Sequence, residues 1–356
     1  MGLPEINIYF KQAADTAIKR SGQGIVALIL RDATALEALK NPSSVYDDFD
    51  KVNKTHYTDE NYDYIKKTFL GSPKRVLVEH IGEEDALEAV LSRLKNKKWN
   101  YLAMPSCSEE EAKELADFIA AQRNNKKTFK AVMNYEANDP GVINFATGGI
   151  VAGDKTYTAM QYAPRIAGLL AGLSFNDYER ASATYATLAE VTAIEESVDP
   201  DKDINAGKLI LINDGSGIKI GRAVNSLAQL SDGQKEEMKK IRIVEIMDLI
   251  RDDIHTAYSE NYVGKFANNY DNKLLFVNEV NQYFKRLADN DILEREYENI
   301  AFINVEAQRK WLAEKSDVSN LTDEQIKKAK TGSKVFLGGN ILAVDAMEDL
   351  DMAIGM

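Results

Sequence analysis

The stretch "KRVLVEHIGEEDALEAVLSRLKNKKWNYLAMP", residues 74–105, contains the pattern that decides the fold class. An apolar run ends at Gly82, an amphipathic segment covers 83–98, and a second apolar run covers 99–105. The middle segment places its apolar residues on one helical stripe, namely Leu87, Val90, Leu91 and Leu94. Because short apolar runs on either side of such a segment are typical of buried strands, these residues predict a strand–helix–strand unit.

The same alternation continues on both sides of this unit. Further strands are predicted over 24–32 and 129–135, and further helices over 61–71 and 108–127. The last of these helices begins with Ser108 as its N-cap and Glu111 three residues later, which is the pattern of a capping box. Strands that alternate with helices at this spacing predict an α/β domain with a parallel sheet and right-handed crossovers.

Two more elements precede a polar joint. The segment 141–153 predicts one further strand and a glycine turn, and 157–174 predicts an apolar helix whose small residues suit close packing. The polar stretch 195–208 is interpreted as the joint between this domain and the rest of the chain.

The second half predicts an α+β domain rather than a continued alternation. A β-hairpin is expected over 209–227, with "GSG" as its turn. Helices are predicted over 233–262, 272–293 and 322–332, a strand over 297–310, and an extended segment over 334–354.

Strand-like segments are also predicted close to both ends of the sequence. Near the N-terminus, "LPEINIYF" (3–10) places Ile6, Ile8 and Phe10 on one face, and the polar run 11–24 follows. Near the other end, "EDLDMAIGM" (348–356) alternates apolar and polar residues in the same way. Because chain ends are usually polar and frayed, two apolar strands in these places are a first indication of function.

Composition excludes several classes of function. The 356 residues are enough for two domains. The net charge of −12, with scattered basic residues, argues against nucleic acid as a partner. The single cysteine fits a reducing compartment, and no signal peptide is visible, so a cytoplasmic location is expected. The longest apolar runs, 24–30 and 166–173, are shorter than the ~20 residues that cross a bilayer, so no membrane insertion is expected.

Three patterns resemble catalytic or binding motifs, and each has a simpler interpretation. Cys107 lies between a strand and a helix, where a thiol could be activated, but it also fits a small loop residue. The "GSGIKIG" stretch (215–221) lacks the helix that a phosphate loop requires and favours a hairpin turn. The acidic stretch 199–207 lacks the glycine and the terminal acid of a calcium loop. We therefore predict no catalytic residue, no cofactor and no metal.

Several stretches, taken in order, resemble the contractile tail sheath proteins of phages and R-type bacteriocins, in the short Gram-positive branch that includes diffocin-like particles. The stretches that carry this resemblance are "ATGGIVAGDKTYTAMQYAPRIAGLLAG" (146–172), "IGRAVNSLAQL" (220–230), "ENYVGKFANNYDNK" (260–273), "VNEVNQYFKRLADNDIL" (277–293) and "ILAVDAMEDLDMAI" (341–354). The resemblance covers nearly the whole chain and is most specific in its second half.

The resemblance implies a structural subunit rather than an enzyme. Such subunits polymerise helically around a tail tube, contract, and drive the tube through a target envelope, with baseplate and tail terminator proteins as further partners. Assembly would occur in the bacterial cytoplasm, before release in a phage tail or bacteriocin particle. The implied domains are an N-terminal arm (1–22), an α/β outer domain (23–195), an α+β sheath domain (196–333) and a C-terminal extended arm (334–356).

The resemblance also implies that the two arms pair with neighbouring subunits by adding strands to their sheets. The implied intersubunit anchors are Ile6, Ile8, Phe10, Val344, Met347, Leu350, Met352 and Ile354. Other interpretations are a cytoplasmic hydrolase-like or transferase-like α/β enzyme, a monomeric binding module, and arms that fold back as edge strands of their own domain.

Overall fold

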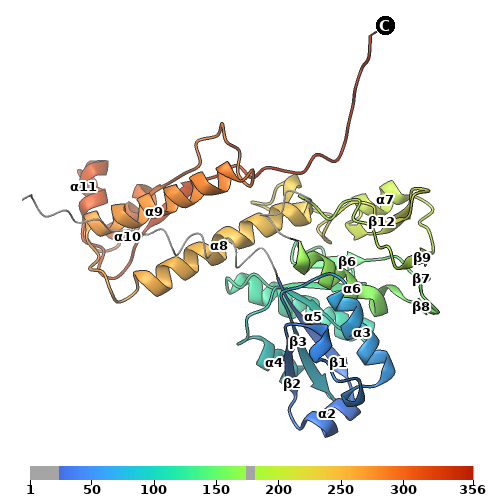
Figure 1. Cartoon of the computed structure of the whole chain (residues 1–356). Helices are drawn as coiled ribbons and strands as arrows, with labels where there is room; N and C mark the ends of the chain where they lie inside the picture. Colours follow the sequence, from blue (N-terminus) through green and yellow to red (C-terminus); the bar gives the residue numbers. More distant parts are fainter. Residues whose placement is uncertain (1–23, 174–180, 356) are drawn as a thin grey trace, which may run out of the picture. The chain divides into compact units, whose positions relative to one another are not determined.

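The computed structural model describes residues 24–173 and 181–355, which divide into two compact units (Figure 1). The α/β unit contains the described residues up to Glu245 together with those from Ala346 onward. The C-terminal unit contains Ile246–Asp345. Within the described residues, no helix combines the length and the apolar character that a membrane-spanning segment requires.

A seven-stranded sheet, in the order β10-β6-β5-β4-β1-β3-β2, forms the centre of the α/β unit. All neighbouring strands are parallel except β2, which is antiparallel to β3. The strands are β1 (Ile25–Arg31), β2 (Ser43–Tyr46), β3 (Arg75–Ile81), β4 (Tyr101–Ala103), β5 (Lys130–Met133), β6 (Val142–Phe145) and β10 (Lys208–Leu209). The predicted parallel α/β domain is therefore confirmed.

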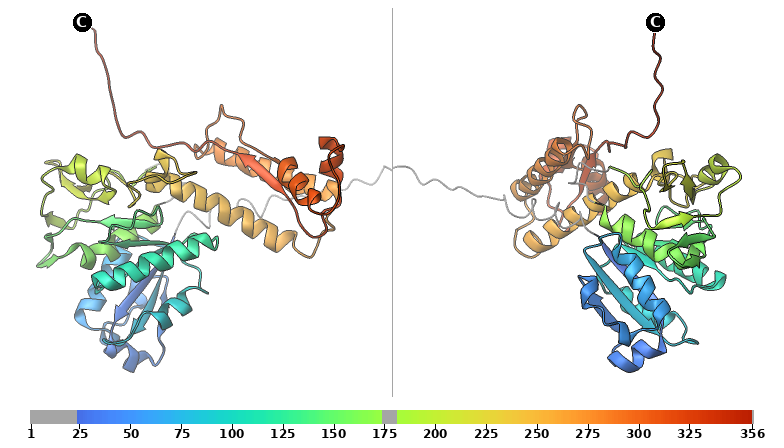
Figure 2. Two further views of the ribbon diagram at one scale, coloured as in Figure 1. Left: turned by 180° about the vertical axis from the view of Figure 1, so that it is seen from behind. Right: turned by 45° about the vertical axis from the view of Figure 1, so that its right-hand side comes forward.

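Helices cover both faces of this sheet (Figures 1 and 2). Val26, Leu28 and Leu30 of β1 join one buried cluster, and the alternate residues Ala27 and Ile29 join the other. Helices α3 (Asp59–Phe69) and α6 (Ala159–Gly172) pack on the first cluster, and α4 (Glu88–Leu94) and α5 (Glu109–Asn124) pack on the second. Burial on both faces explains why the β1 sequence is apolar without interruption.

Helices α3 and α6 approach each other closely through glycine. A Cβ atom added to Gly168 of α6 would overlap the backbone carbonyl of Thr68, and one added to Gly172 would overlap the carbonyl of Gly71. The predicted helix with a small-residue face is thus α6, and its face packs against the end of α3.

Smaller elements complete the α/β unit. They are α2 (Ala33–Leu39), α7 (Pro200–Asn205), the short helices Phe49–Lys51, Lys54–His56 and Glu236–Lys239, and the strands β7 (Ile150–Ala152), β8 (Lys155–Tyr157), β9 (Val191–Ala193), β11 (Leu211–Asn213) and β12 (Ile218–Ile220). Strands β11 and β12 form the predicted hairpin, and Gly215 and Gly217 of its turn have positive φ. The "GSGIKIG" stretch is therefore a hairpin turn.

In the α/β unit, the structure differs from the sequence-based boundaries most clearly at 83–98 and 195–208. The helix predicted over 83–98 is limited to Glu88–Leu94, because the Asp85 carboxylate accepts the Gly82 N–H at 2.8 Å and closes a turn before it. The stretch 195–208 does not separate two units, because Lys208 and Leu209 pair with Asn144 and Phe145 of the sheet. Residues 196–245 consequently belong to the α/β unit.

The C-terminal unit is built from long helices and a two-stranded sheet. Its elements are α8 (Ile241–Asn261, from Ile246 onward), α9 (Tyr270–Asp289), β13 (Ile300–Ile303), α10 (Val305–Ala313), α11 (Asp323–Lys328) and β14 (Leu337–Asn340). The strand predicted over 297–310 is shorter than expected because Asn304 caps α10, accepting the Ala307 N–H. The helix predicted over 322–332 ends at Lys328, and a capping box of Thr322 and Gln325 begins it.

Candidate functional site

The C-terminal segment begins as a strand of its own unit. Strand β14 lies antiparallel to β13, with Leu337 opposite Ile303 and Asn340 opposite Ile300. Further along, the Val344 N–H donates to the Ile292 carbonyl at 3.0 Å. The first part of the predicted arm is therefore paired within one chain.

The outer edge of β13 is closed by a side chain. The Asn304 N–H donates to the Phe336 carbonyl, so Asn304 and Phe336 form a hydrogen-bonded pair of the antiparallel ladder. Because hydrogen-bonded and non-hydrogen-bonded pairs alternate, the peptide groups of Ala301 point away from β14. There the Ala301 N–H donates to Asn281 Oδ1 at 2.6 Å, and Asn281 Nδ2 donates back to the Ala301 carbonyl at 3.3 Å. The Asn281 amide from α9 thus replaces a neighbouring strand.

The outer edge of β14 is open. The same alternation turns the peptide groups of Leu337 and Gly339 away from β13. Among the described residues, none hydrogen-bonds to these groups. Because Gly339 is exposed and only two strands form this sheet, another strand can be added along β14.

Beyond Asp345, acidic side chains fix the segment to the α/β unit. The Glu348 carboxylate, whose side chain is only 5% exposed, accepts hydrogen bonds from Ser182 at 3.0 Å and Thr184 at 2.6 Å. Lys240 Nζ lies 3.1 Å from the same carboxylate. Asp349 forms an ion pair with Arg222, which lowers the pKa of the Asp349 carboxyl.

The predicted apolar anchors differ in their surroundings. Val344 is half-buried. The next four are exposed in a single chain: Met347 (103%), Leu350 (86%), Met352 (65%) and Ile354 (76%). Ile6, Ile8 and Phe10 lie outside the described residues. The structure therefore leaves the C-terminal anchors without apolar cover, and their contact with a neighbour stays a prediction.

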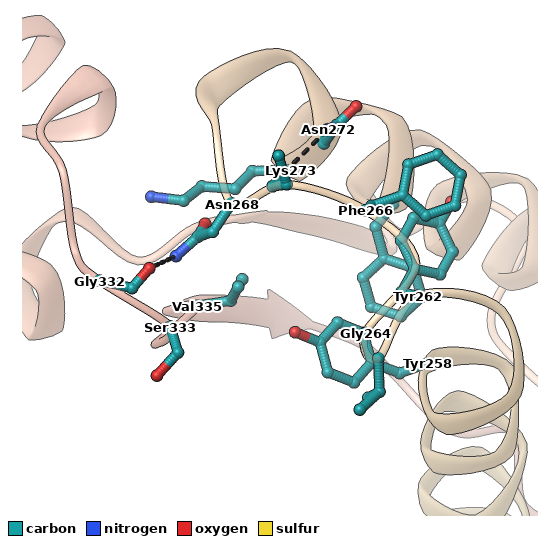
Figure 3. A pocket seen from close by; sticks show the side chains of 13 residues that line it. Tyr258, Tyr262, Gly264, Phe266, Asn268, Asn272, Lys273, Gly332, Ser333 and Val335 are labelled. Carbon is teal, nitrogen blue, oxygen red and sulfur yellow. Dashed lines mark hydrogen bonds between the residues drawn. The ribbon is translucent and has the colours of Figure 1, made fainter.

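An aromatic pocket of about 590 Å³ lies in the C-terminal unit, close to the start of β14 (Figure 3). Its apolar wall consists of Tyr258, Tyr262, Val263, Phe266, Phe276 and Val335. Asn268 Nδ2 donates to Thr331, Gly332 and Lys334, which ties the loop before β14 to the wall.

Lys273 lies in the same pocket lining and is buried without a counter-ion. Its Nζ donates to Gln308 Oε1 at 3.3 Å and to Thr331 Oγ1 at 3.2 Å, and both acceptors are neutral. Burial lowers the pKa of Lys273. In the part of the chain that the structure describes, no carboxylate pairs with this lysine.

A second cavity, of about 450 Å³, lies in the α/β unit beside Asn134 and Ala146, the residues that follow β5 and β6. Glu195, Glu196 and Asp203 make its lining acidic, and no histidine or cysteine is among the lining residues. The Asp203 carboxylate already bonds to Ser197 and Lys208.

Cys107 and the acidic stretch 199–207 are the two remaining patterns that resembled chemical sites in the sequence. Burial raises the pKa of the Cys107 thiol to about 12, which disfavours the reactive thiolate. Asp199 is the N-cap of α7 and accepts the Lys202 N–H. Across the two described ranges, no group of three or more histidine, cysteine, aspartate or glutamate side chains is arranged to hold a metal ion.

Comparison with known proteins identifies the class of protein. A family model described as "Phage tail sheath C-terminal domain" matches residues 233–356. The tail sheath protein of Clostridium phage phiCD119 is 35% identical over 369 aligned residues, which cover 100% of this chain and 99% of that protein. The chain belongs to the phage tail sheath protein family, whose members are structural proteins.

Solved structures show the same fold at low identity. A sheath tail protein from Desulfitobacterium hafniense gives a TM-score of 0.68 at 16% identity, over 85% of this chain and 93% of that one. The helical sheath of the anti-feeding prophage, in its contracted state, gives a TM-score of 0.70 at 13% identity, over 100% and 99% of the two chains. The α/β part and the C-terminal α+β part are thus a sheath protein fold.

Proposed function

We propose that this chain is the repeating subunit of a contractile tail sheath, which polymerises helically around a tail tube and shortens to drive the tube through a target envelope. Its family membership and its likeness to a contracted helical sheath support this function. Its partners are further copies of itself, the tail tube protein, and the baseplate and tail terminator proteins. Assembly takes place in the bacterial cytoplasm, before release within a phage tail or bacteriocin particle.

Subunits are linked by exchanged strands. The observation that carries this proposal is an exposed alternating segment, Leu350, Met352 and Ile354, in a chain that also offers the open edge of β14. An isolated two-stranded sheet is marginal, so a strand added from another copy would complete it. The N-terminal anchors Ile6, Ile8 and Phe10 are proposed to link a further copy in the same way.

The incoming strand is directed to β14 rather than to β13. A strand placed along β13 would have to displace both hydrogen bonds between Asn281 and Ala301. Along β14 it would find the peptide groups of Leu337 and Gly339 ready to pair. The links then follow one edge of the sheet in every subunit.

Each link is modest, and the polymer depends on their number. A fully buried apolar side chain contributes about 1.5–3 kcal/mol, so three anchors contribute roughly 5–9 kcal/mol. Ordering the arm costs about 1–2 kcal/mol per residue, which offsets much of this gain. The free energy that drives contraction is stored when the sheath assembles, so contraction requires no nucleotide. During contraction the subunits rotate, and the exchanged strands keep neighbouring subunits connected.

Electron microscopy of the chain with purified tail tubes tests this function. The intact chain should form sheaths on the tubes, whereas a variant that ends at Asp345 should stay dispersed but folded. This truncation keeps the Val344–Ile292 hydrogen bond and removes the exposed anchors. A Val198→Asp variant, changed at a fully exposed position of the α/β unit, is the control and should assemble. Sheaths formed by the truncated chain would contradict the role of the arm, and no sheath from the intact chain would contradict the function.

A further inference from the structure

We propose that the aromatic pocket of the C-terminal unit binds residues 350–354 of a second copy of this chain. The inference rests on the proposed strand exchange and names the site at which the exchanged arm is anchored. It adds to main-chain pairing along β14 a side-chain pocket that would fix the register of the arm.

The pocket presents apolar surface that the described residues leave uncovered. Phe266 and Val263 line it and are 44% and 58% exposed. Behind them, the rings of Tyr262 and Phe276 meet edge to face, with centroids 4.7 Å apart. Figure 3 shows Tyr258, Tyr262 and Phe266 together on one side of the cavity, with Asn268 and Ser333 on the other. Aromatic walls of this kind accommodate methionine and branched aliphatic side chains.

The charge of the pocket calls for an acidic partner. Lys273 is buried with neutral hydrogen-bond acceptors only, and desolvation of an unpaired ammonium is unfavourable. Lys265 and Lys334, next in sequence to lining residues, add positive charge near the rim. In addition, Asn268 Oδ1 is a buried acceptor without a partner among the described atoms. A ligand that brings apolar side chains, a carboxylate for Lys273 and a backbone N–H group for Asn268 Oδ1 would satisfy this lining.

The C-terminal arm has the complementary composition. Residues 345–355 contain Asp345, Glu348, Asp349 and Asp351 and no lysine or arginine. Glu348 and Asp349 already bond within their own chain, whereas Asp351 is exposed and has no partner among the described residues. Leu350 before Asp351, and Met352 and Ile354 after it, are exposed apolar residues. The arm therefore supplies the apolar groups and the carboxylate together.

The position of the pocket fits an arm that runs antiparallel along β14. Gly332, Ser333 and Val335 line the pocket immediately before β14 begins at Leu337. An antiparallel arm opposite Leu337–Asn340 would continue past Leu337 and reach these residues with its last part. Met352 and Ile354 would then lie at the pocket entrance, near Phe266.

A labelled peptide tests this inference directly. Fluorescein-labelled, C-terminally amidated peptide 345–355 is titrated with the dispersed full-length chain and followed by anisotropy. Phe266→Asp should weaken binding about tenfold or more, because it places a charge in the apolar wall. Leu70→Asp, changed at a leucine that is 46% exposed in the α/β unit, is the matched control and should bind within about twofold of the unmodified chain. A peptide carrying Asp351→Asn should bind about threefold to tenfold more weakly, with the difference reduced by salt.

Each outcome decides between this inference and the proposed function. Equal affinity for the unmodified chain and Phe266→Asp would overturn the pocket as the anchor while leaving pairing along β14 intact. Absence of peptide binding to the unmodified chain would also overturn it, and the truncation experiment would still judge strand exchange separately. If Phe266→Asp binds the peptide normally but fails to coat tail tubes, the inference is overturned, and the pocket contacts the tube protein instead of the arm. Circular dichroism checks folding, and Val263→Asp provides a second variant at a more exposed position.

Discussion

The α/β unit and the C-terminal unit differ in the size of their sheets and in the support of their edge strands. The seven-stranded sheet is buried on both faces and ends in the short strands β2 and β10. The sheet of the C-terminal unit has two strands, one edge closed by Asn281 and one edge open. The edge strands β2 and β14 are equally short, so the difference lies in their support: helices cover both faces of the seven-stranded sheet, whereas β14 belongs to a sheet of only two strands, which is marginal by itself. The seven-stranded sheet is therefore well supported within its own unit, whereas the two-stranded sheet would gain from a further strand along β14.

The largest expected effect on stability comes from a change in the packing of α3 against α6 in the α/β unit. In an ordinary helix, changing glycine to alanine stabilises by about 1 kcal/mol. For Gly168→Ala we expect the opposite sign and a loss of about 3 kcal/mol or more in the free energy of unfolding, because the new Cβ would overlap the Thr68 backbone carbonyl. Urea unfolding of the purified protein measures this change.

Gly148→Ala is the control for the helix-packing variant. Its new Cβ would approach only the Glu195 carboxylate, at 3.3 Å, and that side chain can move. We expect a change within about 0.5 kcal/mol. Equal stability of the two variants would show that α3 and α6 can separate without loss.

A smaller expected effect is the dependence of the free energy of unfolding on pH, which His80 of the α/β unit contributes. His80 of β3 is 1% exposed, and burial lowers its pKa to about 4, helped by Arg93 and opposed by Asp32 and Glu79. Since the unfolded histidine has a pKa near 6.5, the unfolded state binds more protons between about pH 6.5 and pH 4. The stability that the neutral imidazole contributes is therefore complete above pH 6.5 and is lost as the pH falls through this window.

For the unmodified chain we expect the free energy of unfolding to fall by about 2 kcal/mol between pH 8 and pH 5 from His80 alone. His80→Gln keeps a neutral polar group near Ser44, whose hydroxyl lies 3.2 Å from His80 Nε2, and should remove that part of the pH dependence. Urea titrations at both pH values provide the comparison, with His56→Gln, at a half-exposed position outside the core, as the control. An unchanged pH profile in His80→Gln would refute the assignment.

The sequence predicted the α/β unit well because its signals are local. Apolar runs of strand length and the Ser108–Glu111 capping box can be recognised without knowing the fold, and the structure contains both. The absence of a boundary near residue 195 could not be recognised in this way, because it depends on the pairing of Lys208 with Asn144 in the sheet. Local patterns thus predict elements, while pairing between distant segments decides which unit they join.

The candidate site was only partly visible in the sequence for the same reason. The alternation of Leu350, Met352 and Ile354 identifies the arm. By contrast, Asn281 lies 20 residues from Ala301 and Glu348 lies 166 residues from Ser182, so neither interaction leaves a local pattern. A polar residue within a helix and an acidic residue in a tail both resemble ordinary solvated positions.

The smallest expected effect tests the closed edge of the C-terminal unit. Asn281→Ala leaves the N–H and the carbonyl of the buried Ala301 without partners, which should cost about 1–2 kcal/mol in the free energy of unfolding. Asn278→Ala, on an exposed turn of the same helix, is the matched control and should change stability by less than about 0.5 kcal/mol.

Asn281→Ala also tests whether the Asn281 amide keeps an added strand away from β13. With the amide removed, β13 offers the same unpaired groups as β14, so the proposed strand exchange would have a second edge available. We expect irregular polymers or aggregates of this variant by electron microscopy, at a chain concentration where Asn278→Ala forms only regular sheaths. Regular sheaths from both variants would show that the Asn281 amide stabilises β13 without selecting the edge, because an unblocked β13 would then have remained unused.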